Sequence, residues 1–208
     1  MLKTLIVSYL PRGQISKTKK ILDVFLNEIR AKSVRPEHLD LAEDVPDFFI
    51  PERLDAYVQR DYRGKKLTKK QTDLMSKMDR MTGQAVDCDV LVLTYPMYNF
   101  SFPAPVKAYF DSIMLKGKTW DYKDRKFVGL MKGKKALVIT TSGADYSSEA
   151  MKVYEHSVSL ARAEFQFMGF DEVKIVAAQG VDSGRDKSQE LIAQAQKKVR
   201  SIVQKWYS

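Results

Sequence analysis

VLVLTYPMYNFSFPAPVKAYFDSIMLKGKTW, spanning Val90 to Trp120, is the stretch that decides the predicted fold. Val90 to Thr94 form an apolar run typical of a strand buried on both faces of a parallel sheet. A turn from Pro96 to Asn99 follows, and an amphipathic helix is predicted from Ala104 to Leu115. Ligands of open parallel sheets bind beyond the carboxyl ends of strands, and a loop with aromatic, amide and proline residues suits a flat heteroaromatic ring.

Strand and helix patterns alternate on both sides of this stretch. Four further strands are predicted, at Thr4 to Ser8, Val34 to Leu41, Ala136 to Thr141 and Val173 to Ala178. The second is weak because Pro36 and Glu37 interrupt its pattern. The alternation predicts an α/β fold: a doubly wound sheet of five parallel strands, with helices on both faces and a switch point between strands one and three.

Helices are predicted between and after these strands. Ser16 is the expected N-cap of the first, whose apolar residues recur at helical spacing: Ile21, Leu22, Phe25 and Ile29. A helix from Thr68 to Ala85 is expected to bury one face, formed by Leu74, Met78 and Met81. Two further helices are predicted from Glu149 to Met168 and from Asp186 to Trp206.

Two segments depart from this alternation. Ala42 to Lys66 is rich in proline, acids and aromatic residues, and is too long for a plain connection in a compact domain. Such segments usually form a lid, a binding loop or an oligomer contact. Trp120 to Leu130 alternates aromatic and charged residues, which predicts a small hairpin outside the main sheet.

Composition limits the compartment and the number of domains. The 208 residues, 44% of them hydrophobic, predict one globular domain over residues 1–208. The single cysteine, Cys88, allows neither a disulfide nor a thiolate metal cluster within one chain, so we expect a reducing cytoplasm. The start of the chain lacks the pattern of a signal peptide, and no apolar run approaches the roughly 18 residues of a membrane span.

A formal net charge of +9 raises the question of polyanion binding. The densest basic run contains Lys65, Lys66, Lys69 and Lys70, but Asp61 and Asp73 flank it. A solvated basic surface that attracts anionic cofactors is therefore the preferred interpretation, with no nucleic acid and no membrane as partner. A protein that binds polyanions is the alternative.

Three loops are expected to meet at the carboxyl edge of the sheet. The first, Ser8 to Thr18, has neither a Walker nor a dinucleotide glycine motif. It offers the hydroxyls of Ser16 and Thr18 beside the free amides of a helix start, which suit a phosphate monoester, although simple N-capping explains the same residues.

The other two loops have features that suit a flat ring. Met97 and Tyr98 can flank an aromatic ligand, and the Asn99 amide can bond ring nitrogens and carbonyls, unless the turn is only a packed connector. In the third loop, the small residues Ser142, Gly143 and Ala144 let backbone N–H groups approach a ligand closely.

The two histidines, His38 and His156, stand apart from any carboxylate and cysteine cluster, so no metal site is expected. Lys107 and Asp111 are predicted to form a surface pair at i, i+4.

YPMYNFSFPAPVKAYFDSIMLKGKTWDY, followed by GLMKGKKALVITTSGADY and GFDEV, resembles the FMN-dependent NADH azoreductases and the related NAD(P)H quinone reductases of the flavodoxin-like superfamily. The likeness covers most of the chain. It implies a flavodoxin-like fold that binds FMN and uses NADH or NADPH as co-substrate. The cofactor-binding residues it implies are Ser16, Thr18, Pro96, Met97, Tyr98, Asn99, Phe100, Ser142, Gly143 and Ala144.

The resemblance also implies ping-pong hydride transfer through the flavin to quinones or azo compounds. Tyr146 is the candidate to donate a hydrogen bond or a proton to the reduced acceptor. Related reductases are homodimers, in which Phe48 to Tyr62 and Trp120 would provide cover for a flat substrate. The sequence departs from the family pattern just after the first strand, where the common hydroxyl residue is Tyr9 or is displaced to Ser8, depending on the alignment. It departs again at Ala144, where a second glycine is common.

A flavodoxin-type electron carrier or a flavin reductase is the alternative function. Such carriers are typically acidic, whereas a basic surface suits the phosphates of a nicotinamide dinucleotide. Neither the preferred nicotinamide nor the physiological acceptor follows from the sequence.

Overall fold

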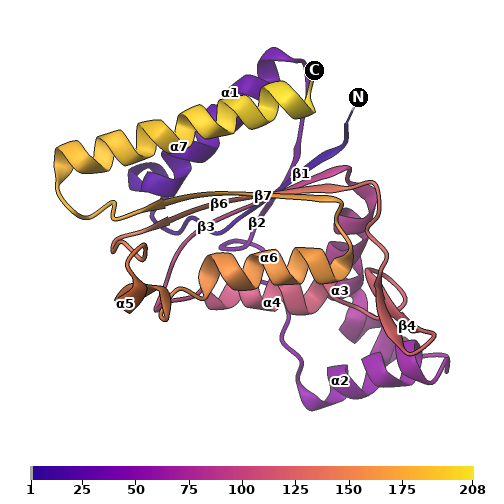
Figure 1. Cartoon of the computed structure of the whole chain (residues 1–208). Helices are drawn as coiled ribbons and strands as arrows, with labels where there is room; N and C mark the ends of the chain where they lie inside the picture. The colour runs from indigo at the N-terminus through magenta and orange to yellow at the C-terminus, as the bar shows by residue number, and fades with distance from the viewer. Residues whose placement is uncertain (1) are drawn as a thin grey trace.

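The computed structural model describes residues 2–208 and is built around a sheet of five parallel strands (Figure 1). In spatial order these are β2 (Glu37–Asp40), β1 (Thr4–Ser8), β3 (Val90–Pro96), β6 (Lys135–Ser142) and β7 (Glu172–Gln179). The direction of winding reverses between β1 and β3, so the predicted doubly wound α/β fold and its switch point are confirmed.

The two central strands are the most buried elements of the molecule. Every residue of β3 except Pro96 is buried, as is every residue of β6 except Lys135. Each pairs in register with both neighbours, so its backbone N–H and C=O groups are satisfied while its side chains are excluded from water. The apolar run on which the fold prediction depended thus forms the middle of the sheet.

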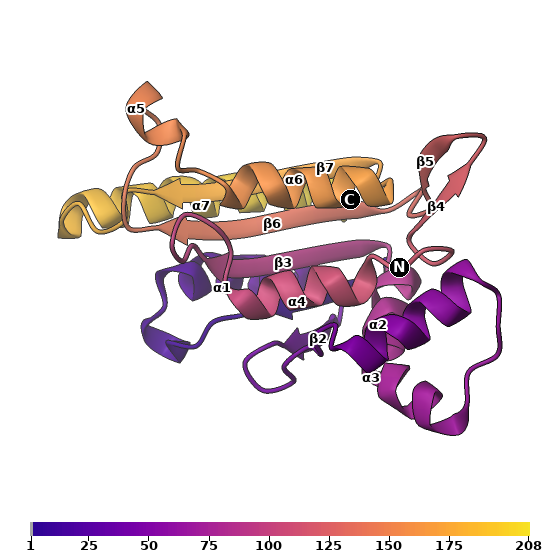
Figure 2. The same ribbon diagram turned by 90° about the horizontal axis from the view of Figure 1, so that it is seen from below.

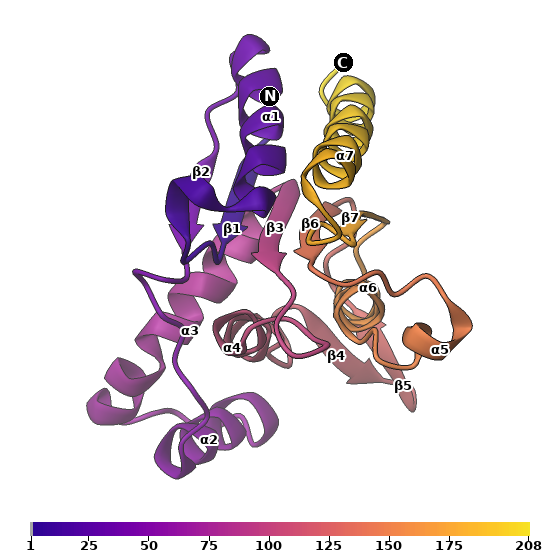
Figure 3. The same cartoon turned by 90° about the vertical axis from the view of Figure 1, so that its left-hand side faces the viewer.

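Helices cover both faces of the sheet, as Figures 1 and 3 show. The helices α1 (Lys17–Ala31) and α7 (Arg185–Trp206) lie together on one face. The opposite face carries α3 (Lys69–Asp87), α4 (Ala104–Ile113) and α6 (Ser157–Met168). Two hydrophobic clusters result, one on each face of the sheet.

The apolar faces of the helices agree with the sequence pattern except at one position. Ile21, Leu22, Phe25 and Ile29 of α1 are all buried, as predicted. In α3 the buried methionines are Met75, Met78 and Met81, whereas Leu74 is only half-buried, so its predicted place in the buried face is wrong. The 3.6-residue period puts Met75 on the same stripe as Met78 and Thr82, and Leu74 to its side.

The predicted second strand begins too early. Val34 is buried but not paired, and β2 begins only at Glu37. Ser33 has a φ of 60° and Pro36 has no N–H to donate to a ladder, so the chain cannot extend pairing across this link. The edge strand is consequently short.

The predicted helix from Glu149 to Met168 is interrupted. A short helix, α5 (Glu149–Lys152), is separated from α6, which begins at Ser157. The Glu155 carboxylate accepts the N–H groups of Ser157 at 2.9 Å and Val158 at 2.8 Å. A carboxylate in this position caps a new helix start, which explains the break.

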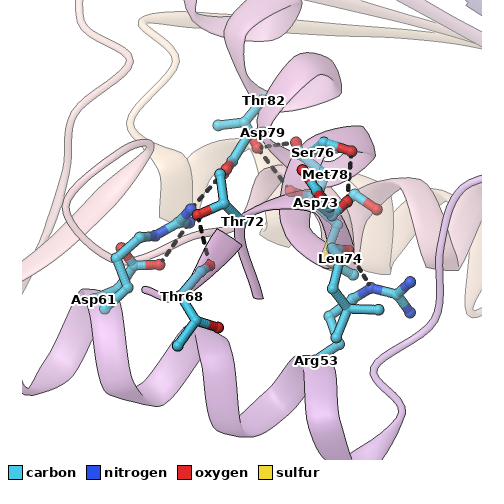
Figure 4. Close-up of polar contacts among 12 residues, drawn as sticks. Arg53, Asp61, Thr68, Thr72, Asp73, Leu74, Ser76, Met78, Asp79 and Thr82 are labelled. Carbon is cyan, nitrogen blue, oxygen red and sulfur yellow. Dashed lines mark hydrogen bonds and ion pairs between the residues drawn. The ribbon is translucent and has the colours of Figure 1, made fainter. Parts of the chain in front are cut away.

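The long irregular segment is partly helical. It contains α2 (Pro51–Tyr57), which runs directly into a π-helical turn, η2 (Val58–Tyr62), and both pack beside α3. Figure 4 shows one of the contacts that hold them: Arg53 Nε donates to the Leu74 carbonyl at 3.0 Å. In addition, Arg60 donates to both Asp61 and Asp79. The buried Arg53 thereby satisfies a carbonyl on a neighbouring element.

The predicted hairpin is confirmed as β4 (Trp120–Lys123) and β5 (Lys126–Gly129), which pair antiparallel. Its two turn residues, Asp124 and Arg125, have φ of 49° and 61°, as a type I′ turn requires. The surface pair of Lys107 and Asp111 is confirmed as well.

Burial raises the pKa of the Cys88 thiol to about 12. Within residues 2–208, none of the helices has the length and apolarity needed to cross a membrane.

The hairpin meets the end of α6 through two glycines. A Cβ built on Gly129 would lie 2.4 Å from the backbone nitrogen of Gly169, whose φ of 87° ends α6 in the left-handed region. Gly83 in α3 is a matched control, because a Cβ there meets nothing within 4 Å.

We predict that Gly129→Ala lowers the free energy of unfolding by about 2 kcal/mol or more, since backbone must move to admit the methyl group. Gly83→Ala should raise it by roughly 0.5–1 kcal/mol through helix propensity. Urea unfolding followed by circular dichroism measures both. Equal changes in the free energy of unfolding for the two substitutions would contradict the close approach of Gly129 to the Gly169 backbone.

Candidate functional site

Four loops meet at the carboxyl edge of the sheet, which Figure 3 views directly. They follow β1, β3, β6 and β7, and together they line one cleft. The lining residues are Pro11, Arg12, Ser16, Lys17, Thr18, Pro96, Tyr98, Thr141, Gly143, Val181 and Asp182. The predicted convergence of the loops after β1, β3 and β6 is therefore observed. The loop after β7, which was not predicted to take part, also lines the cleft.

The start of α1 presents unused hydrogen-bond donors to this cleft. Ser16 is its N-cap, as predicted, because its hydroxyl accepts the Lys19 N–H at 3.2 Å. The N–H groups of Lys17 and Thr18 have no acceptor among residues 2–208. Free amides at the positive end of a helix dipole form an anion site.

A buried hydroxyl pair joins this helix start to the sheet. Thr18 Oγ1 lies 2.7 Å from Thr141 Oγ1, the two residues being only 1% and 5% exposed. The pair fixes the first turn of α1 against the end of β6.

The cleft is positively charged at one end. Arg12 and Lys17 both line it. Lys17 Nζ lies 2.7 Å from Asp182 Oδ1 and also donates to the Val181 carbonyl, which ties the start of α1 to the loop after β7. Arg12 has no ion-pair partner among the described residues, so its charge is available to an anion.

The loop after β3 contains a strained turn. Tyr98 and Ser101 exchange backbone hydrogen bonds of 2.9 and 3.0 Å, and the residues between them, Asn99 and Phe100, have φ of 45° and 71°. This is type I′ geometry, which asparagine tolerates but a phenylalanine adopts at a cost of about 1–2 kcal/mol. Such strain is characteristic of ligand-binding sites. The turn leaves the rings of Tyr98 and Phe100 exposed.

The loop after β6 is shaped by Gly143. A Cβ at this position would lie 2.4 Å from Asp182 Oδ2, so only glycine fits without displacing Asp182. The Ser142 hydroxyl donates to the Ala144 carbonyl at 2.9 Å, which shapes the loop internally. The N–H of Ser147 donates to Asp145 and lowers the pKa of that carboxyl.

The structure places half of the predicted cofactor-binding residues in the cleft wall. Ser16, Thr18, Pro96, Tyr98 and Gly143 line it. The other five belong to the chain around the ends of β3 and β6, beside the cleft but outside its lining: Met97, Asn99, Phe100, Ser142 and Ala144.

Sequence reasoning missed the contribution of the loop after β7. Val181 and Asp182 line the cleft, and their N–H groups donate to the carbonyls of Ser142 and Gly143 at 3.1 and 3.2 Å. The run Gly180 to Gly184 directly after a predicted strand was the available signal, because all parallel strands end at the same edge.

The remaining candidates take up structural contacts. Tyr146 is buried against the exposed Phe100 ring, with ring centroids 6.5 Å apart, and its N–H donates to Gln179. His38 Nε2 lies 2.8 Å from Ser8 Oγ, and the His156 N–H donates to the Phe100 carbonyl. In the part of the chain that the structure describes, no cluster of three His, Cys, Asp or Glu side chains suits a metal ion.

Comparison with known proteins adds to this geometry. The family model for the flavodoxin-like fold matches residues 2–203. The chain belongs to this flavodoxin-like family.

Curated relatives of this chain share one name, FMN-dependent NADH:quinone oxidoreductase. An FMN-dependent NADH:quinone oxidoreductase of Laribacter hongkongensis (strain HLHK9) is 34% identical over 80% of this chain and 82% of its own length. Another, from Azospirillum brasilense, is 29% identical over 97% of both chains. Among solved flavodoxin-like structures, an FMN-dependent NADH-azoreductase from Bacillus anthracis str. Ames Ancestor, in complex with FMN, has a TM-score of 0.90 at 27% identity and full coverage of both chains.

We predict that Thr18 and Thr141 are coupled in a double-mutant cycle. Thr18→Val or Thr141→Val alone leaves one buried hydroxyl unpaired and should lower the free energy of unfolding by about 1–3 kcal/mol. The double substitution removes both partners and should cost less than the sum of the two, with an interaction energy of about 1 kcal/mol. Urea unfolding of the four proteins gives the cycle, and additive effects would contradict the hydroxyl pair.

Proposed function

We propose that this protein is an FMN-dependent NAD(P)H oxidoreductase that reduces quinones and azo compounds. The observation that carries the proposal is the cleft at the switch point, where an anion site and an aromatic turn lie side by side in a family whose relatives are FMN-dependent reductases. FMN needs such a pair of features, because a phosphate and a flat ring stand at its two ends.

The anion end of the cleft fits the FMN phosphate. The free N–H groups of Lys17 and Thr18, the Ser16 and Thr18 hydroxyls, and the Arg12 guanidinium all face or line this region. Each is a hydrogen-bond donor to an oxyanion, and the helix dipole adds to the attraction. We assign the phosphate to these groups.

The aromatic end fits the flavin ring. Pro96 and Tyr98 line the cleft, and the strained turn holds Asn99 and Phe100 beside it. We assign the ring to this turn, with Met97 against the ribityl chain. We assign the pyrimidine end to Ser142, Gly143 and Ala144, where the absence of a side chain on Gly143 admits close approach.

When bound, FMN supplies the redox chemistry, accepting electrons from NADH or NADPH and passing them to the acceptor. The chain's own residues bind, orient and exclude water. Tyr146 is the proposed hydrogen-bond donor to the reduced acceptor, because its ring packs beside that of Phe100 in the turn after β3. Tyr95 is unsuited to this role, since burial raises the pKa of its phenol and the side chain is fully enclosed.

The electron-carrier alternative is less consistent with the surface. A formal net charge of +9 favours a small anionic donor such as a nicotinamide dinucleotide. The buried Cys88 thiol suits the cytoplasm that we propose as its compartment. We further propose that residues 1–208 act as one flavin-binding domain.

We also propose a homodimer in which each copy covers the other's cleft. Phe48, Leu54 and Tyr62 are 59%, 46% and 53% exposed on and around α2 and η2. In Figure 2 this region and the hairpin bearing Trp120 lie at the end of the sheet opposite α5. They are therefore remote from the cleft of their own chain, and only a second copy can bring them to it.

The predicted cycle is visible by absorbance. Purified protein supplied with FMN should show a flavin spectrum that bleaches anaerobically with NADH or NADPH and returns when a quinone is added. Bound flavin that never bleaches would favour the electron carrier. Failure to take up FMN would overturn both functions.

Arg12→Gln should weaken FMN binding about tenfold, because a hydrogen bond to a charged group contributes roughly 1.5 kcal/mol. Arg63→Gln, an exposed position outside the cleft, is the control and should leave affinity unchanged. Quenching of flavin fluorescence measures both dissociation constants.

Dimerisation should be detectable as a doubled mass by sedimentation at micromolar concentration. Tyr62→Glu should shift the protein toward monomer and lower quinone reduction while flavin stays bound, since the charge enters an apolar contact. Val86→Glu, at another exposed apolar position, is the control. A strict monomer with full activity would refute the shared cleft.

A further inference from the structure

A second cleft adjoins the first on the other side of Lys17. It has a volume of about 510 Å³ and lies between the start of α1 and the start of α7. Its lining residues are Lys17, Lys20, Val181, Asp182, Gly184, Arg185, Ser188, Gln189 and Ile192. Three of these, Lys17, Val181 and Asp182, also line the first cleft, so only the Lys17–Asp182 ion pair and its loop separate the two.

The floor of the second cleft is the start of a 22-residue helix without a side-chain cap. Its N-cap is Gly184, whose φ of 109° is open only to glycine and which has no side chain to accept a hydrogen bond. The N–H groups of Arg185, Asp186 and Lys187 have no acceptor among residues 2–208. These donors stand at the positive end of the α7 dipole.

The hydroxyl of a largely buried serine, Ser188, is a second and independent feature of this cleft. Ser188 is only 6% exposed, and it lines the cleft. Ser188 is the first residue of the buried stripe of α7, which continues through Ile192, Ala195 and Val199. An apolar residue would be expected at the position of Ser188, as at the others. Its hydroxyl has no hydrogen-bond partner within the described chain, and its oxygen is not among the fully buried unpartnered atoms, so it opens to the cleft.

The charges around this hydroxyl are mainly positive. Lys20 and Arg185 line the cleft, and neither forms an ion pair with any described residue. Lys17 lies at the boundary and is paired with Asp182, which is the one carboxylate among the lining residues. The lining thus presents two cations without an ion-pair partner and one free hydroxyl, beside the uncapped start of α7, whose first turn also carries the Asp186 carboxylate.

We propose that this cleft is a second anion subsite, which binds a phosphate group that does not belong to FMN. A phosphate is a compact anion with several acceptor oxygens, and it can bond the hydroxyl, the guanidinium and the helix amides at once. The proposal depends on α7 and its loop, and stands whether or not the first cleft binds FMN. The group comes either from free inorganic phosphate or pyrophosphate, or from the adenylate part of a nucleotide.

Inorganic pyrophosphate titrated into the FMN-loaded protein tests the subsite, because the first cleft is then occupied. Isothermal calorimetry at low ionic strength should show one site with a dissociation constant below about 1 mM. Ser188→Ala and Arg185→Gln should each weaken binding about tenfold, as loss of a hydrogen bond to a charged group does. Lys197→Ala, exposed on the same helix away from the cleft, should change nothing.

Residues that line only one of the two clefts distinguish binding at the first from binding at the second. Arg12 lines only the first and Arg185 only the second. In flavin-free protein, Arg12→Gln should leave binding at the second cleft intact, so a failed FMN assignment does not affect this test. Absence of saturable pyrophosphate binding, or binding unaffected by both Ser188→Ala and Arg185→Gln, overturns the subsite.

Titration with adenosine diphosphate distinguishes the two sources of the phosphate group, a nucleotide and a free inorganic anion. Tighter binding than pyrophosphate, with the same loss in Arg185→Gln, supports a nucleotide as the ligand. Equal or weaker binding, with that same loss, supports a free inorganic anion in the same subsite.

Discussion

The parallel pairing of β3 with β1 and β6 is the constraint on which the rest of the structure depends. Strands buried on both faces must satisfy every N–H and C=O through their neighbours, which fixes register and direction together. Parallel strands of one sheet end at the same edge, so the loops that follow β1, β3, β6 and β7 have no other place to meet. The cleft is a consequence of this pairing, and its chemistry is a matter of loop composition.

Sequence patterns predicted the elements whose local signals agree with their surroundings. The apolar run of β3, the stripe of α1 and the hairpin with Asp124 and Arg125 at its turn are examples. The break between α5 and α6 escaped prediction because Glu155 acts as a cap only once its carboxylate reaches the amides of Ser157 and Val158. The helical character of α2 and η2 likewise depends on tertiary partners, such as the Leu74 carbonyl that Arg53 satisfies.

The same distinction holds within the site. Ser16, Thr18, Tyr98 and Gly143 could be predicted because hydroxyl, aromatic and glycine residues mark a loop as functional wherever it lies. Asp182 could not, because its role comes from contact with Gly143 and Lys17, residues far away in the sequence. Contacts of this kind are a property of the folded chain, and no local pattern encodes them.

Lys17 occupies the position where the two clefts are physically coupled. Its ammonium group holds the loop after β7 through Asp182 and the Val181 carbonyl, and both of those residues line both clefts. An anion on either side offers Lys17 a competing partner, and release of Asp182 would also free the space above Gly143. The Asp182 side chain is 72% exposed, so its salt bridge to Lys17 is weak enough for Lys17 to change partner. A phosphate bound in the second cleft would therefore alter the first cleft by drawing Lys17 away from Asp182.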